Sequence, residues 1–102
     1  MSWEQGKVLL SHAVRHFVSQ GGKLEYEMFI EDGQKRWLLY GVTPSGDRLQ
    51  VFLQRTGDAK IFRNANAVVN YHESMCPEDG SVNVPIVDKD GNMAVTPDAD
   101  TT

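Results

Sequence analysis

Between Lys23 and Arg63, polar and apolar side chains alternate along the chain, and turn-forming residues separate the alternating segments. Such alternation is typical of half-buried β-strands, while Asp32-Gly33 and Pro44-Ser45-Gly46 are typical hairpin turns. We therefore expect an antiparallel meander of four strands, at residues 23–31, 36–43, 48–55 and 59–62. This pattern constrains the fold most because it gives each strand a neighbour and an inward face.

The chemistry of the two turns sets the register of the strands. A two- or four-residue loop at the Asp-Gly turn pairs even positions of the first strand with odd positions of the second. A type I turn at Pro-Ser, followed by glycine, sets Gly41 opposite Leu49 and, further along, Trp37 opposite Leu53. The predicted core face then contains Leu24, Tyr26, Met28, Ile30, Trp37, Leu39, Leu49, Val51 and Leu53.

An amphipathic helix pattern stands on each side of the meander. Ser2 is a capping residue, apolar side chains then recur at helical spacing, and Gly21-Gly22 ends the pattern, which predicts a helix at residues 3–20. Asn64 is a preferred N-cap residue, which predicts a second helix at residues 64–75. Together these elements predict an α+β fold in the order αββββα.

The length of 102 residues fits one domain, which we place at residues 1–76. That part carries nine Lys and Arg against eight Asp and Glu, whereas residues 77–102 carry one Lys against six acids. We expect the second part to be an acidic arm, irregular or folded as a hairpin around Asp90-Gly91, and mobile from about residue 96. A nearly neutral body provides no long-range field for capturing nucleic acid.

The reactive residues form no recognisable catalytic or metal-binding motif. Cys76 is the only cysteine, which excludes an internal disulfide and predicts no cysteine-based metal site. His72, four residues earlier, is within helical reach of it, but a single His–Cys pair is a weak signal for a nucleophile. His12 and His16 share one helix face without the glutamate of the zinc protease motif. We therefore predict that the protein is not an enzyme and has no cofactor.

Two acidic patterns have simpler interpretations than catalysis or calcium binding. The segment 88–92 begins like a calcium loop, but its sixth and twelfth positions are Met93 and Ala99, so a turn at Asp90-Gly91 is the better interpretation. Glu25 and Glu27 lie on one side of a strand and are expected to be exposed charges.

The second face of the predicted sheet is more apolar than a solvated face usually is. Either the helix at 64–75 or the segment 77–95 covers this face, or it binds another protein or a second copy of the chain. The alternative ligand is single-stranded nucleic acid, since sheet aromatics can stack on bases while basic residues hold phosphates. The candidate interface residues are Phe29, Leu38, Tyr40, Val42, Phe52, Arg48, Arg55 and Arg63.

The strand at Ile61-Phe62, followed directly by a capped helix, is similar to small accessory proteins of plasmids and phages. That resemblance implies an accessory role on a mobile element. The chain has no apolar run long enough to span a membrane and no basic start followed by an apolar segment, so we expect a cytoplasmic protein.

Overall fold

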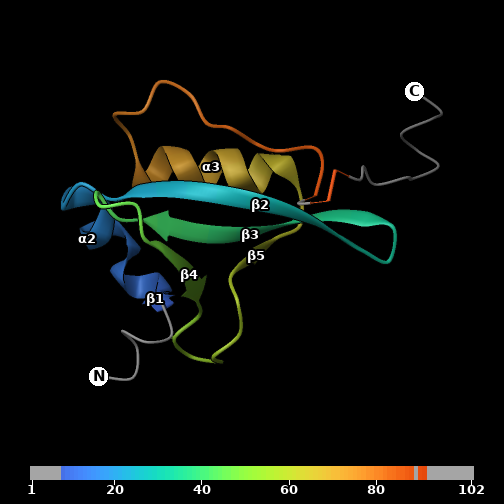
Figure 1. The fold of residues 1–102 in the computed structure, drawn as a ribbon, viewed down its shortest axis with the longest axis horizontal. Helices are drawn as coiled ribbons and strands as arrows, with labels where there is room; N and C mark the ends of the chain where they lie inside the picture. The colour runs from blue at the N-terminus through green and yellow to red at the C-terminus, as the bar shows by residue number, and fades with distance from the viewer. Residues whose placement is uncertain (1–7, 89, 92–102) are drawn as a thin grey trace.

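The computed structural model describes residues 8–88, 90 and 91, and these form an α+β fold with one mixed sheet (Figure 1). Five strands make the sheet, and three helical segments accompany them. The strands are β1 (Val8–Leu10), β2 (Lys23–Glu31), β3 (Gln34–Val42), β4 (Arg48–Phe52) and β5 (Ile61–Phe62). The helical segments are the 3-10 turn η1 (Ser11–Ala13) and the helices α2 (Val14–Ser19) and α3 (Ala65–Met75).

The predicted register of the first hairpin is confirmed. Met28 lies opposite Trp37 and Tyr26 opposite Leu39. Asp32 has φ 54° and Gly33 has φ 77°, the two positive values that a two-residue type I′ turn requires. The alternating burial along β2 follows from this turn.

The second hairpin also keeps its predicted register where its strands pair. Gly41 lies opposite Leu49, and Gly46 adopts the left-handed conformation at φ 100°. The ladder between β3 and β4 covers only three pairs, and β4 ends at Phe52 rather than at residue 55.

The predicted fourth strand pairs with β4 at a single antiparallel bridge, between Phe52 and Ala59, and does not continue the meander from there. Beyond Phe52 the chain turns back at once, with the Leu53 amide donating to the Asp58 carbonyl over 2.7 Å. The chain then crosses to β3, where Phe62 lies opposite Trp37, the place expected for Leu53. Phe62 is the larger apolar side chain and is buried there, whereas Leu53 is half-buried.

The predicted helix at 3–20 is wrong in its first half. Residues 3–7 lie outside the described part of the chain, but Val8–Leu10 is a strand that pairs in parallel with β4, and α2 begins only at Val14. The sheet is therefore mixed, in the order β1-β4-β3-β2, and not an antiparallel meander. A short apolar run fits a strand as well as a helix, and here the open edge of β4 supplies the hydrogen-bond partners.

The second helix is confirmed, with Asn64 as its N-cap. The Asn64 side-chain oxygen accepts from the Ala67 amide over 2.8 Å. Val68 and His72 are its buried side chains, and Figure 1 shows α3 lying along β2.

Both helices cover the same face of the sheet, the one predicted to be the core. Tyr26 meets His72 of α3, and a Cβ on Gly41 would come within 2.7 Å of the Phe17 ring of α2. Ile30 and Leu49 are half-buried at the margins of this face, whereas Leu53 lies just beyond the end of β4 and is also half-buried. The buried apolar residues are Val14, Leu24, Tyr26, Met28, Trp37, Leu39, Val51, Phe62, Val68 and Cys76.

The segment after α3 runs back over the same face (Figure 1). The Trp37 indole N–H donates to the Pro85 carbonyl over 2.9 Å, Val82 and Val84 pack against the core, and Asp88 forms a bridge with Met28. The expected hairpin partners beyond residue 91 and the expected mobile end lie outside the described residues.

Candidate functional site

The opposite face of the sheet brings the five predicted apolar side chains together. Residues paired across a ladder point to the same side of a sheet, so the observed registers place these residues on the face away from Trp37. All five are half-buried: Phe29, Leu38, Tyr40, Val42 and Phe52. Within the described part of the chain, α3 and the segment 80–88 contact the other face, so neither covers this one.

Two further apolar side chains, both exposed and both missed in the sequence, extend this face. Leu10 pairs with Phe52 and Ile61 pairs with Leu38, so both point to the same side, and they are 40% and 41% exposed. Leu10 was not assigned to this face because its segment was predicted to be helical. The signal that could have found it was the apolar run Val8-Leu9-Leu10, which suits an edge strand. We call these seven residues the open face.

One arginine neutralises the acidic side of the open face. The Arg48 guanidinium lies 3.2 Å from Glu25 and 3.2 Å from Glu27, and its carbon lies 3.8 Å from the centre of the Tyr40 ring. Burial raises the pKa of Tyr40, and Glu27 adds to the rise. Glu25 and Glu27 thus serve as ion-pair partners across the strands.

The other basic residues are placed differently from one another. Arg36 lies on the open face, with Nε 3.5 Å from Glu31. Arg55 is exposed in the turn after β4, and Arg63 is exposed just after β5. The structure therefore puts Arg48 on the face itself and the two other predicted arginines in the segments that flank β5.

A second polar arrangement lies at the C-terminal end of α3. The Tyr26 hydroxyl lies 2.8 Å from Nδ1 of His72, and Nε2 of His72 lies 2.7 Å from a carboxylate oxygen of Asp79. An ionised carboxylate can only accept, so Nε2 of His72 is the donor to Asp79; when the ring is neutral, Nδ1 accepts the Tyr26 hydroxyl proton. Burial strongly raises the pKa of Tyr26, which keeps that hydroxyl protonated.

Cys76 lies beside this arrangement without a base to activate it. Burial raises the pKa of its thiol, and the nearby Asp79 raises it further. Both ring nitrogens of His72 are already hydrogen-bonded, so the imidazole has no free position for accepting the thiol proton. The geometry therefore gives no support to a nucleophilic Cys76.

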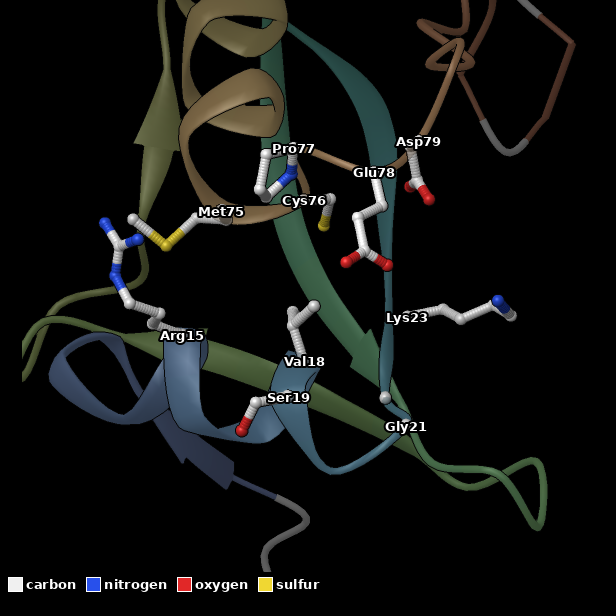
Figure 2. Close-up of a pocket in the computed structure, with 11 residues that line it drawn as sticks. Arg15, Val18, Ser19, Gly21, Lys23, Met75, Cys76, Pro77, Glu78 and Asp79 are labelled. Atoms are coloured by element: carbon white, nitrogen blue, oxygen red, sulfur yellow. The ribbon is translucent and has the colours of Figure 1, made fainter.

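The end of α3 and the start of β2 line a cavity of about 520 Å³ (Figure 2). Its wall on the α3 side consists of Met75, Cys76, Pro77, Glu78 and Asp79, and α2 supplies Arg15, Val18 and Ser19. Figure 2 shows that the side chains of Cys76 and Glu78 project into this cavity. The sequence did not indicate this cavity, because its walls come from segments about 55 residues apart.

The remaining candidates behave as expected from their simpler interpretations. His12 and His16 are both exposed. Asp88 closes a turn, accepting from the Asp90 amide over 2.9 Å, and Gly91 has φ 86°. The turn prediction is confirmed over the described residues of this segment.

Comparison of the chain with protein-family models, with curated proteins and with solved structures found no match. Of the helices in the described part, none is long and apolar enough to cross a membrane. The function is therefore inferred from the geometry of the open face.

Proposed function

We propose that this chain is a small, non-enzymatic binding module whose open face pairs with the same face of a second copy. The observation that carries the proposal is that all five strands contribute apolar side chains to a face that the helices and the segment 80–88 do not cover. Apolar patches of this kind on monomers usually mark interaction sites. An accessory role on a plasmid or phage belongs to the same proposal and rests only on the order of β5 and the capped α3.

The distribution of charge supports a second copy as the occupant. The acidic residues Glu25 and Glu27 lie on β2, and Arg48 lies on β4, on the other side of β3. A two-fold axis parallel to β3 would set Glu25 and Glu27 of each copy over Arg48 of the other, so the ion pairs made within each copy can also form between the copies. An isologous interface needs this kind of self-complementarity.

Single-stranded nucleic acid is the alternative ligand, and the geometry favours it less. A base stacking on Tyr40 would have to displace the Arg48 guanidinium, which already lies 3.8 Å from the ring centre. Its ion pairs with Glu25 and Glu27 would also have to break before Arg48 could hold a phosphate. If nucleic acid did bind, the exposed Arg55 and Arg63 would contact its phosphates.

The proposal is tested by placing a charge on the open face without disturbing the core. Leu10→Lys and Ile61→Lys change side chains that are 40% and 41% exposed, so the folded monomer should tolerate them. We expect wild type to sediment as a dimer at low and high salt, because apolar association is weakly salt-dependent. Each variant should raise the dimer dissociation constant at least about tenfold, as expected for burying an unpaired charge.

The matched control is Ile86→Lys, which makes the same change at a residue of the segment after α3 that is 58% exposed. It should leave the dimer intact. A wild type that is monomeric at all concentrations would overturn the homodimer. Binding of a labelled oligonucleotide that falls steeply with salt and is lost in Arg55→Ala or Arg63→Ala would favour the alternative.

A further inference from the structure

Three side chains with metal-binding atoms converge where α3 ends. The donor atoms of His72, Cys76 and Asp79 all lie within 4.8 Å of one another. In a tetrahedral zinc site, bonds of about 2.0–2.3 Å set the donor atoms about 3.3–3.6 Å apart. The three donors therefore need only small side-chain rotations to reach that geometry.

The backbone holds these three residues in place. His72 and Cys76 are four residues apart and lie on one face of the last helical turn, where the Cys76 amide donates to the His72 carbonyl over 2.7 Å. Pro77 ends the helix, and the Asp79 amide then donates to the Cys76 carbonyl over 3.0 Å. The turn thus returns the Asp79 carboxylate to the His72 ring, which explains why spacing alone did not reveal the cluster.

The surroundings of His72 also fit a metal ligand. Metal-binding histidines usually fix their second ring nitrogen by a hydrogen bond, and Tyr26 supplies that bond to Nδ1 of His72. Nε2, the nitrogen nearer to Asp79, is then the metal-binding atom. His72 is 6% exposed, so its ring cannot easily turn away.

We propose that His72, Cys76 and Asp79 form a zinc site that opens onto the cavity beside α3. Thiolate and imidazole select zinc over calcium or magnesium, which prefer oxygen ligands. A thiolate and a carboxylate also balance the charge of the ion. This site is independent of the open face and of the proposed dimer.

The fourth position of the tetrahedron faces the cavity. Glu78 lines the cavity next to Cys76, and its carboxylate or a water molecule completes the coordination (Figure 2). On binding, the Cys76 thiol loses its proton to solvent. The ring proton of His72 moves from Nε2 to Nδ1, so the hydrogen bond with Tyr26 reverses and the hydroxyl becomes the acceptor.

A zinc ion here would join three parts of the fold. It would tie the last turn of α3 to the start of the segment that covers the core, and through Tyr26 it would fix both to β2. Metal that binds only the folded state stabilises it. We therefore expect a structural ion.

The test uses the full chain, freed of metal with a chelator, reduced, and titrated with Co²⁺ as the spectroscopic probe. We expect one equivalent to bind, with a thiolate-to-cobalt charge-transfer band and the intense visible bands of a tetrahedral ion, and we expect Zn²⁺ to displace it. Zn²⁺ alone should raise the thermal unfolding midpoint. Absence of the charge-transfer band in wild type would overturn the proposal.

Two conservative variants test the ligands without emptying the core. Cys76→Ser should abolish the charge-transfer band, and Asp79→Asn should keep a hydrogen bond to His72 but weaken Co²⁺ binding at least about tenfold. Tyr26→Phe should weaken it by about 10–100-fold, as other outer-shell losses do. Circular dichroism melting without metal shows whether each variant is folded.

The controls are the double variant His12→Ala/His16→Ala, which removes the exposed histidines, and Glu73→Gln, which changes an exposed acid of α3 outside the cluster. Both should bind Co²⁺ as wild type does. Binding that is lost in the double variant and kept in Cys76→Ser would place the metal elsewhere and refute the site.

Discussion

At the scale of single residues, the partly buried Tyr71 of α3 makes the free energy of unfolding depend on pH. Tyr71 packs edge-on against Phe62, with ring centres 5.1 Å apart, and burial raises its pKa to about 12 from the usual 10.0. A raised pKa means that the folded state holds the hydroxyl proton more tightly than the unfolded state does. Stability from this group is therefore complete below about pH 10 and is lost as the pH rises toward 12.

We expect Tyr71→Phe to reduce that alkaline loss. The variant keeps the ring that packs on Phe62, and no hydrogen bond ties the hydroxyl to another described residue. Urea unfolding of wild type should show a falling midpoint between about pH 9 and pH 12, and the variant should fall less over the same range. Equal pH slopes for the two proteins would show that Tyr71 ionises normally in the folded state.

At the scale of secondary-structure elements, the sequence correctly predicted the helices and strands that begin or end at a recognisable turn or capping residue. Asp32-Gly33 fixed the register of β2 and β3, and Asn64 marked the start of α3. The segment 8–10 had no such signal, and its apolar residues fit either a helix or a strand. This segment forms a strand because it pairs with the open edge of β4, a tertiary contact that the sequence alone does not reveal. The open face was predictable because register alone places its residues, apart from those that β1 and β5 contribute.

The packing of α2 on the sheet depends on glycines that sequence alone does not distinguish from turn residues. A Cβ on Gly22, in the turn between α2 and β2, would lie 2.3 Å from the Phe17 ring of α2, so this ring packs directly against the backbone of that turn. We expect Gly22→Ala to destabilise the fold by about 1–3 kcal/mol, the usual cost of overpacking. Gly80→Ala is the matched control, because nothing lies within 4 Å of its added methyl group. Equal denaturant midpoints for the two variants would show that α2 can move to accommodate the methyl group without loss of stability.

At the scale of the whole molecule, the segment after α3 belongs to the core although its sequence reads as an acidic arm. Its apolar residues Val82 and Val84 pack on the core face, and Pro85 accepts the indole proton of Trp37. The pattern of prolines and acids concealed this, because the segment forms no regular strand beyond the bridge at Asp88. The polar cluster at Asp79 escaped prediction for the same reason, since it forms only when the chain turns back after Pro77.

Truncation separates the segment that packs on the core from the residues that follow it. A chain ending at Asp79 loses the two half-buried valines and the hydrogen bond from Trp37 to Pro85. Each valine contributes about 1 kcal/mol and the hydrogen bond about 1 kcal/mol. We therefore expect this chain to be about 2–4 kcal/mol less stable than the full chain. That is a large share of the stability of a small domain, about 5–15 kcal/mol. A chain ending at Gly91 keeps these contacts and should unfold at nearly the full-length urea concentration. If both truncated chains unfold together with the full chain, residues 80–88 do not help to close the core, and Trp37 does not need the carbonyl of Pro85.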